Sequence, residues 1–313
     1  MQFIRGLKQW PPAFSGCVAT IGSFDGVHVG HQALIGQLIE HSQRLGVPSV
    51  VMSFEPQPKD YFQPNDCLPR LTRLREKIQC LTLTGVDAFL LLRFDQALAS
   101  LTAEAFVTRI LVRALGVRHV VVGDDFCFGK GRKGDFDCLV SFGKQFGFGV
   151  SRTQSHQLGG VRASSTAIRQ ALVDGQLDWA AQLLGRAYTL SGKIVRGQQK
   201  GRTIGFPTAN LPLFRQQSPV RGVFVVEMLG IDEQPLPGVA NIGNRPTLAG
   251  DGQWVLEVHL FDFNRNIYGR HVQVRFLHKI REEKRFESFH ALKDQIEQDA
   301  AVAKQFFNVK NHG

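Results

Sequence analysis

The sequence has 313 residues and a mass of 34.8 kDa, which is enough for about two domains that each bury a core. Hydrophobic residues make up 43% and charged residues 20%, and this composition excludes a disordered chain. No segment approaches the ~18 uninterrupted apolar residues of a membrane span, and residues 1–12 lack the apolar block of a secretory signal. We therefore expect a cytoplasmic protein with no membrane partner.

The formal net charge of +10 is spread along the chain, with 19 basic against 15 acidic residues in 1–185 and 18 against 12 in 186–313. Diffuse positive charge suits small phosphorylated ligands at least as well as nucleic acid. The five cysteines are odd in number and form no CxxC pair, so we expect idle thiols and neither a zinc site nor a disulfide framework.

The first half alternates strand and helix patterns. We expect strands at 17–22, 49–54, 88–92 and 119–122, separated by amphipathic helices. One helix face is formed by Leu71, Leu74, Ile78 and Leu81, and Thr102 is the expected N-cap of a later helix. Apolar strands between such helices predict a Rossmann-like parallel sheet covered on both faces, with ligands at the carboxyl ends of its strands.

The second half consists of short β-rich pieces broken by Gly and Pro, at 189–195, 223–228, 254–261 and 272–276. Their spacing predicts an antiparallel β-barrel, followed by a C-terminal helix from about 286 to 306. Residues 178–185 are expected to form the last helix of the first half. We therefore expect two domains, 1–185 and 186–313.

Residues 22–31 read GSFDGVHVGH and connect the first strand of this pattern to a helix. Glycines allow the backbone to approach a ligand, and the start of a helix favours phosphate. His28 and His31 are three residues apart, so both rings can face one spot. We expect both rings to face a phosphate held by the turn of Gly22, Ser23, Phe24, Asp25, Gly26 and Gly30; the alternative is two polar histidines that cap a helix.

This arrangement resembles the nucleotidyltransferase superfamily, and residues 162–169, RASSTAIR, are similar to its second phosphate-binding segment. The resemblance implies that His28, His31 and Arg169 are catalytic. It also implies that ATP is bound by the turn at 22–30 and by Arg162, Ser164, Ser165 and Thr166. The alternative is a capped helix with exposed arginines.

Two further stretches follow predicted strands, FEPQP at 54–58 and VGDDFCFG at 122–129. Their aromatic and prolyl surfaces suit a flat heterocycle, although ordinary loop packing is the alternative. With the preceding motifs they resemble the flavin-specific adenylyltransferase domain of the bacterial bifunctional riboflavin kinase/FAD synthetases. Flavin contacts are expected from Phe54, Pro56, Pro58, Asp125, Phe126 and Phe128.

Residues 197–210, GQQKGRTIGFPTAN, are the most informative stretch of the second half. ATP binding is expected in a tight basic loop with Gly201, Arg202, Gly205 and Pro207. Thr208 and Asn210 point the same way on an extended segment, and their oxygens are hard ligands for Mg²⁺ bound with ATP. GFPTAN is similar to the signature of riboflavin kinases; the alternative is a β-turn followed by an edge strand.

Glu257 alternates with Leu256 and Val258, so it lies on the face opposite the aliphatic stripe. A kinase acting on an alcohol gains from a base, and the resemblance assigns this catalytic role to Glu257, whereas most strand glutamates are only solvated. By the same resemblance, Arg281, Glu283 and Phe286 are expected to contact the flavin in this domain. The alternative is that this stretch is only the charged start of a helix.

The resemblance runs from about Gly16 to Asp299, with departures at Gln57, Gln199 and Asn244. It implies that ATP phosphorylates riboflavin to FMN and that a second ATP adenylylates FMN to FAD, with pyrophosphate released. Mg²⁺ would accompany ATP, while FMN and FAD would be substrate and product rather than prosthetic groups. We expect a monomer or weak homo-oligomer. The alternatives are a single-activity flavin adenylyltransferase with an inactive barrel, or a basic nucleic-acid-binding barrel protein.

Overall fold

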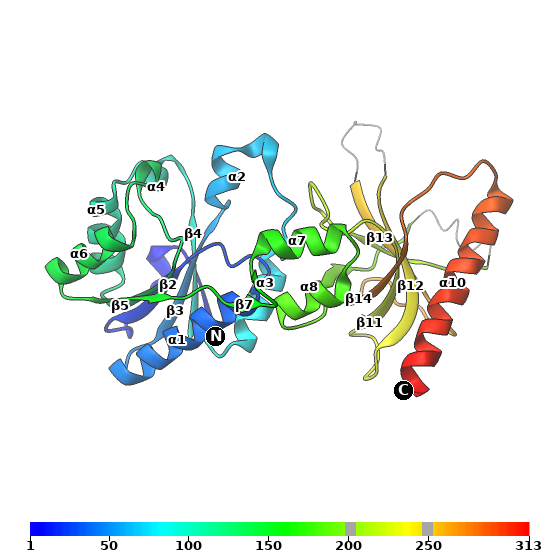
Figure 1. Ribbon diagram of the computed structural model, residues 1–313, viewed down its shortest axis with the longest axis horizontal. Helices are drawn as coiled ribbons and strands as arrows, with labels where there is room; N and C mark the ends of the chain where they lie inside the picture. Colours follow the sequence, from blue (N-terminus) through cyan, green and yellow to red (C-terminus); the bar gives the residue numbers. More distant parts are fainter. Residues whose placement is uncertain (198–204, 246–252, 313) are drawn as a thin grey trace. The chain divides into compact units, whose positions relative to one another are not determined.

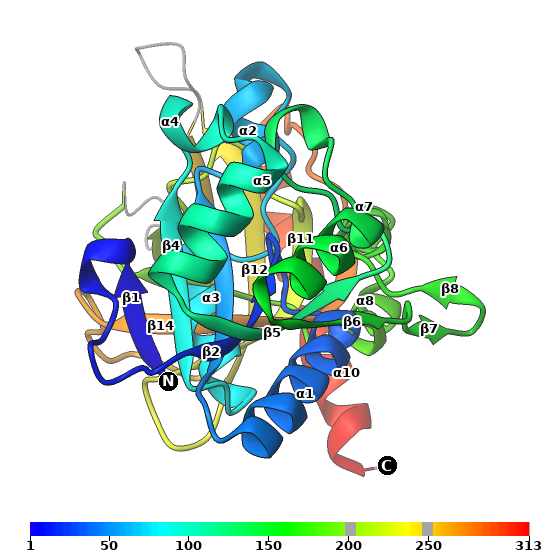
Figure 2. The same ribbon diagram turned by 90° about the vertical axis from the view of Figure 1, so that its left-hand side faces the viewer.

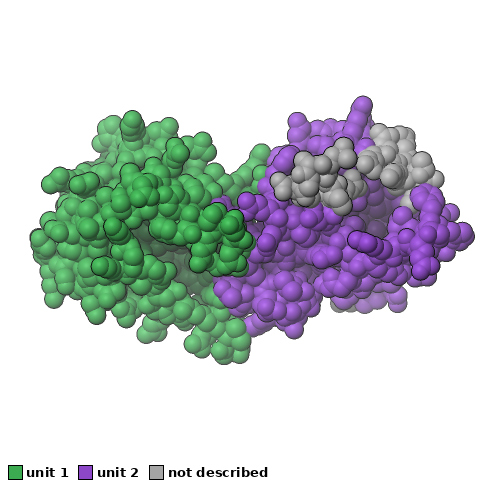
Figure 3. All heavy atoms as spheres, turned by 90° about the horizontal axis from the view of Figure 1, so that it is seen from above, with its two compact units in different colours: residues 1–68, 72–164 green, residues 69–71, 165–313 purple. Residues whose placement is uncertain are grey.

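The computed structural model describes residues 1–197, 205–245 and 253–312. Contacts divide the chain into two compact units (Figures 1 and 3). Unit 1 comprises residues 1–68 and 72–164, and unit 2 comprises residues 69–71 and 165–313. Helices α7 (Ser165–Val173) and α8 (Leu177–Leu184) therefore cluster with the second unit. The domain boundary near residue 185 stays a prediction.

Unit 1 contains the predicted parallel sheet, with six strands in the order β1-β4-β3-β2-β5-β6. The strands are β1 (Gln2–Arg5), β2 (Cys17–Ile21), β3 (Ser49–Glu55), β4 (Ala88–Arg93), β5 (Val117–Gly123) and β6 (Gly149–Thr153). The four central strands are the predicted ones. The edge strands β1 and β6 were not predicted, because a strand that is covered only in part lacks the continuous apolar run of a buried strand.

Helices cover both faces of this sheet (Figure 2). On one face α1 (Val29–Leu45) and α3 (Leu74–Leu83) bury Leu38 and Leu81 against Val18 and Val121. The other face is covered by α5 (Ala103–Phe106), the π-helix Val107–Ala114 and α6 (Phe136–Phe146). Leu71 is buried but precedes α3, so the predicted helix starts one turn later than its apolar spacing indicates.

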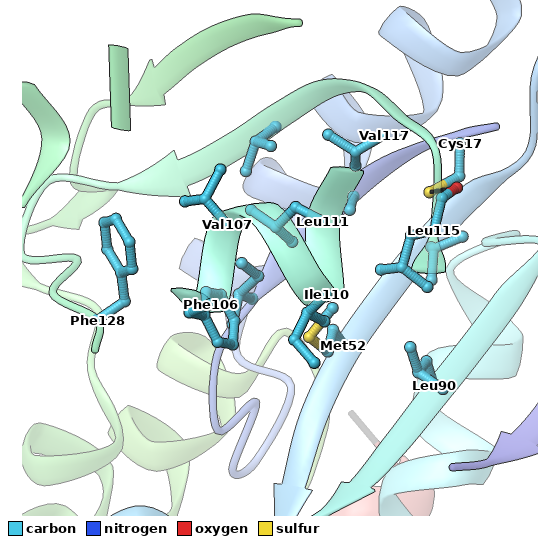
Figure 4. Close-up of a cluster of buried hydrophobic side chains, with 14 of the residues drawn as sticks. Cys17, Met52, Leu90, Phe106, Val107, Ile110, Leu111, Leu115, Val117 and Phe128 are labelled. Atoms are coloured by element: carbon cyan, nitrogen blue, oxygen red, sulfur yellow. Dashed lines mark hydrogen bonds between the residues drawn. The ribbon is translucent and has the colours of Figure 1, made fainter. Parts of the chain in front are cut away.

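The core under the π-helix is drawn in Figure 4. Phe106 and Ile110 pack over the sheet with Met52, and the Cys17 thiol donates to the carbonyl oxygen of Leu115 at 3.8 Å. Burial raises the pKa of Cys17 to about 12, so this thiol is not a nucleophile at neutral pH.

The remaining elements of unit 1 are short. They are η1 (Leu7–Gln9), α2 (Pro58–Phe62), η2 (Pro64–Asp66), α4 (Gln96–Ala99), η4 (Lys130–Arg132), and the hairpin β7 (Gln157–Leu158) with β8 (Val161–Arg162). As predicted, the Thr102 side chain caps α5, where it accepts from the backbone N–H of Ala105.

Unit 2 is the predicted antiparallel barrel, with strand order β10-β13-β12-β11-β14-β9. Its strands are β9 (Thr189–Lys193), β10 (Ala209–Pro212), β11 (Gly222–Leu229), β12 (Leu236–Arg245), β13 (Gln253–Leu260) and β14 (His271–Arg281). An isolated bridge between Val195 and Asn210 brings the two edge strands together, so the barrel is nearly closed. Phe224 and Phe276 fill its interior, with ring centroids 5.2 Å apart.

The C-terminal helix α10 (Phe289–His312) packs on the outside of the barrel, where Ala300 and Ala303 meet Val223 and Val225. The expected start near 286 is three residues early, because residues 282–288 form an irregular segment. Along the described residues, no helix is long and apolar enough to cross a membrane.

Candidate active sites

The histidine pair lies where β2 ends and α1 begins, at the carboxyl edge of the unit 1 sheet. His28 is the N-cap of α1, and its Nδ1 accepts from the backbone N–H of His31 at 3.3 Å. The two imidazoles stack with centroids 3.6 Å apart and an interplanar angle of 21°. A Cβ at Gly30 would lie 3.2 Å from His28 Nδ1 and 3.3 Å from the carbonyl oxygen of Ala163, so a larger residue here would crowd the His28 ring.

The turn before the pair has an unusual backbone. Phe24 and Val27 adopt positive φ angles of 47° and 42°, a region that non-glycine residues rarely occupy. The ring of Phe24 is buried and lies 5.0 Å from that of His31. Backbone strain of this kind persists only where the surroundings hold it in place.

A polar contact from another part of unit 1 holds the turn. Asp25 is 1% exposed and accepts from both the backbone N–H of Thr72 (2.9 Å) and its hydroxyl (3.1 Å). The Thr72 hydroxyl in turn accepts from the backbone N–H of Gly26 at 2.9 Å. The contact of Thr72 with Asp25 was not predicted, because nothing in the local pattern indicates a contact across 47 residues. Asp25 and Gly26 therefore shape the turn, and their contact with ATP stays a prediction.

The second predicted phosphate segment is divided between the two units, with Arg162 and Ser164 in unit 1 and Ser165, Thr166 and Arg169 in unit 2. Arg162 forms ion pairs with Asp124 (2.8 Å) and Asp125 (3.2 Å). The Ser155 hydroxyl and the Arg162 guanidinium hold the pKa of Asp124 below its ordinary value. Within unit 2, α7 begins at Ser165, and Arg169 donates to the carbonyl oxygen of Pro69 at 2.7 Å.

The predicted flavin contacts of unit 1 follow β3 and β5. Phe54 makes an edge contact with Phe94, at a centroid distance of 5.7 Å. Phe126 stacks on Phe128 at 5.5 Å, but Phe128 is 7% exposed and belongs to the core, so only a small part of its ring can face a ligand. Asp125 is exposed and pairs with Arg162, as described above.

The FEPQP stretch passes from the end of β3 into α2. Pro58 is the first residue of α2 and Gln57 its N-cap, while Pro56 is exposed. The Nε2 atom of Gln57 is buried and has no hydrogen-bond partner among the described residues. A buried donor in this state is available to a ligand group.

A cavity of about 520 Å³ opens in unit 2 between the barrel, the 282–288 segment and α10. It gathers five of the residues predicted for the kinase site, namely Thr208, Glu257, Arg281, Glu283 and Phe286. Its remaining walls are largely apolar and include Phe206, Leu292 and Ile296. A cavity of this size and character suits a flat heterocycle.

Glu257 lies in β13, directly opposite Asn210 of β10 and Asn241 of β12. Residues in direct register on antiparallel strands share a face, so the carboxylate lies between two amides. Neighbouring His259 also lines the cavity, and its Nδ1 lies 3.0 Å from the carbonyl oxygen of Pro207. Burial lowers the pKa of His259, and the neutral ring donates to this carbonyl.

The predicted magnesium ligands, Thr208 and Asn210, belong to the segment that leads into β10. Asn210 is 5% exposed; its Nδ2 donates to the carbonyl oxygen of Thr208 at 3.2 Å, and its Oδ1 has no hydrogen-bond partner among the described residues. A Cβ at Gly197 would lie 2.5 Å from this amide, so only glycine fits there. A buried acceptor oxygen without a donor, beside a hydroxyl, fits a hard divalent cation.

Not every predicted ATP contact of this segment can be placed. Gly201 and Arg202, like Gln199, lie outside the described residues. Gly205 has a φ of +85°, which is the left-handed region that favours glycine, and Pro207 follows it toward β10.

Arg281 and Glu283 are held at the cavity by ion pairs. Arg281 donates from Nε and Nη2 to the carboxylate of Asp299, at 2.9 and 2.6 Å, and Asp299 is 3% exposed. Glu283 accepts from Arg221 at 3.2 Å and lies over Gly243, where a Cβ would overlap the carboxylate. Asp299 was not predicted as the partner of Arg281. Its position on the apolar face of the predicted helix could have indicated a buried carboxylate that needs a counter-charge.

A second cavity of about 590 Å³ is lined in part by Pro207, Thr208 and Ala209. Its cations and aromatics include Arg196, Arg265, Phe263 and Tyr268, and the guanidinium of Arg196 lies 5.6 Å from the centre of the Tyr268 ring. Thr208 lines both cavities. This cavity was not predicted from the sequence. The pattern that could have indicated it is the interleaving of Phe, Arg, Asn and Tyr in residues 261–270.

The fold and these sites define a protein of two parts. A parallel α/β unit has a histidine pair at its strand ends, and a β-barrel has two cavities that share Thr208 as a lining residue. Comparison with known families agrees with this division. The family model described as FAD synthetase matches residues 11–167, and the one described as riboflavin kinase matches residues 184–307.

Curated relatives cover nearly the whole chain. A protein of Escherichia coli K12 is 52% identical over 310 residues, which is 99% of each chain, and one of Pseudomonas fluorescens is 50% identical over 304 residues, which is 97% of each. Both are named bifunctional riboflavin kinase/FMN adenylyltransferase. A crystal structure from Streptococcus pneumoniae, described as a macrolide-efflux protein, matches with a TM-score of 0.83 and 34% identity over 97% of this chain and 99% of that chain.

The chain therefore belongs to the family of bifunctional riboflavin kinase/FMN adenylyltransferases.

Proposed function

We propose that this chain makes FAD from riboflavin in two ATP-dependent steps, one in each compact unit. The first step is phosphorylation of the ribityl 5′-hydroxyl of riboflavin, in the barrel. The second is adenylylation of the resulting FMN, in the α/β unit. The observation that carries the proposal is the position of Thr208, which lines both barrel cavities, while Glu257 lies in one of them.

In the kinase step, riboflavin occupies the 520 Å³ cavity and ATP the 590 Å³ cavity, so the γ-phosphate meets the hydroxyl beside Thr208. Glu257 takes the proton of the hydroxyl as its oxygen attacks the γ-phosphorus, and ADP leaves. Thr208 and Asn210 hold Mg²⁺, which neutralises charge on the ATP phosphates when it is bound. Arg281, fixed by Asp299, and Phe286 contact the flavin ring.

In the adenylylation step, a phosphate oxygen of FMN attacks the α-phosphorus of ATP, and pyrophosphate leaves. The attacking group is already an anion, so no base and no covalent enzyme intermediate are needed. His28 and His31 stabilise the negative charge that develops on the phosphates, as donors aimed at one spot. Arg162 and Ser164, in the same unit, assist at the β- and γ-phosphates.

The test is a product assay. Riboflavin incubated with ATP and Mg²⁺ should yield FMN first and then FAD, as separated by chromatography with flavin fluorescence. FAD formation from supplied FMN, without FMN formation from riboflavin, would leave only the adenylyltransferase. No flavin turnover at all would refute the proposal.

A further inference from the structure

Lys77 is a buried lysine in unit 1 that none of the preceding roles uses. It belongs to α3, and its side chain is almost completely enclosed, with 2% of its surface exposed. Its Nζ donates to the carbonyl oxygen of Ser23 at 2.6 Å. Burying an ammonium group costs free energy, so a simple packing role does not account for a lysine here.

The carbonyl of Ser23 is held from two sides. The hydroxyl of Ser53, in the completely buried part of β3, donates to the same oxygen at 3.3 Å. Two donors on one oxygen fix the orientation of the peptide that joins Ser23 to Phe24. Phe24 is the residue whose φ of 47° lies in the left-handed region.

A chain of contacts runs from this peptide to the histidine pair. The left-handed conformation of Phe24 places its buried ring 5.0 Å from the ring of His31, and His31 stacks on His28 at 3.6 Å. Release of the Ser23 carbonyl would let the peptide turn and the Phe24 ring withdraw, so His31 would lose its contact with that ring.

We propose that Lys77 is a positioning residue for adenylyl transfer, because its ammonium group fixes the Ser23 peptide and thereby aligns the histidine pair through the Phe24 ring. The inference rests on the proposed function of unit 1. In this mechanism Lys77 acts through the Ser23 peptide and not on the reacting atoms. Its effect is on preorganisation: charge-stabilising donors act only when they are held in place before the reaction.

The test compares Lys77→Met with Arg75→Met in the full chain. Arg75 is an exposed cation of the same helix, so its substitution removes the same formal charge without touching the turn. For Lys77→Met we expect kcat for FAD formation from FMN to fall about 10- to 100-fold, the loss typical of a misplaced catalytic group. The KM for FMN should stay within about twofold, and riboflavin phosphorylation should be unchanged.

Two further readouts separate positioning from a general loss of structure. The His31 imidazole proton resonances, assigned with a His31 variant, should shift in Lys77→Met and not in Arg75→Met, because the ring currents of Phe24 and His28 act on them. Should Lys77→Met fail to fold, Ser53→Ala removes the second donor on the same carbonyl and should lower kcat in the same sense by a smaller factor.

An unchanged kcat in Lys77→Met, or equal losses in Lys77→Met and Arg75→Met, would overturn the inference. So would unshifted His31 resonances in a folded Lys77→Met or Ser53→Ala variant. The proposed function itself is judged separately, by FAD formation in the unaltered chain.

Discussion

At the scale of single residues, the packing contacts of a second histidine pair determine the protonation state of its two rings. His41 of α1 and His119 of β5 stack with centroids 3.9 Å apart. Arg44 donates to Nδ1 of His41 at 2.7 Å, so the remaining ring proton of His41 is on Nε2 and points to the hydroxyl of Ser151 at 3.3 Å. That hydroxyl is 2.7 Å from Nε2 of His119 and donates to it. The contacts thus fix both rings as neutral tautomers.

This pair predicts a loss of stability in mild acid. Burial, and then the proximity of His41 and Arg44, lower the pKa of His119 from 6.5 to about 4. Between these values His119 binds a proton in the unfolded chain and not in the folded chain. The contribution of His119 to the free energy of unfolding therefore falls as the pH falls from about 6.5 to about 4 and then levels off. Denaturant unfolding of the chain and of His119→Phe, at pH 7 and pH 5, should show a smaller drop for the variant. Equal drops would contradict this assignment.

The sequence predicted the His28–His31 pair but gave no indication of this second pair. His28 and His31 are three residues apart, so local helix geometry brings them together. His41 and His119 are separated by 78 residues and meet only because α1 packs on the sheet beside β5 and β6.

At the scale of elements, α10 forms a wall of the 520 Å³ cavity of unit 2. Leu292, Ile296 and Asp299 recur on one face of the helix and line the cavity. The two-donor ion pair with Arg281 anchors this face to the end of β14. The helix therefore contributes to both the stability of unit 2 and the shape of the proposed kinase site.

Asp299→Asn should remove this anchor and leave Arg281 partly buried without a counter-charge. We expect a loss of about 1–3 kcal/mol in the stability of unit 2 and about a tenfold rise in the KM for riboflavin. FAD formation from supplied FMN should be unaffected. Thermal unfolding and steady-state kinetics measure both effects.

Asp294→Asn is the matched control. Asp294 is an exposed carboxylate of the same helix that pairs with His290 one turn earlier, so its loss should change stability by no more than about 0.5 kcal/mol. Equal effects of the two substitutions would show that Asp299 is not an anchor.

At the scale of the whole molecule, the His28–His31 pair and the Thr208–Asn210 segment lie in different compact units, and FMN links the two reactions. His28→Ala should stop FAD formation and leave FMN formation intact, whereas Asn210→Ala should do the reverse. Removal of one charge-stabilising donor typically costs about 10²–10³ in rate. Loss of both activities in either variant would contradict two independent sites.

Mixing the two variants tests whether FMN passes through solution. Neither variant alone should convert riboflavin to FAD, but the mixture should, because FMN made by His28→Ala diffuses to Asn210→Ala. A lag before FAD appears should shorten as the concentration of His28→Ala rises. Absence of FAD from a mixture in which FMN accumulates would show that free FMN is not a substrate.

The sequence by itself determined what depends on neighbours along the chain: the central strands and their order of appearance, the turn before α1, the His28–His31 pair, and the Thr208–Asn210 spacing. Periodicity and short spacings carry this information, because side chains two, three or four residues apart have fixed relative directions in strands and helices. Only the tertiary structure decided which distant residues meet: Thr72 and Lys77 at the turn before His28, Asn241 beside Glu257, Asp299 on Arg281, and the second barrel cavity. Such contacts depend on strand register and on how helices pack, which no local pattern in one sequence specifies.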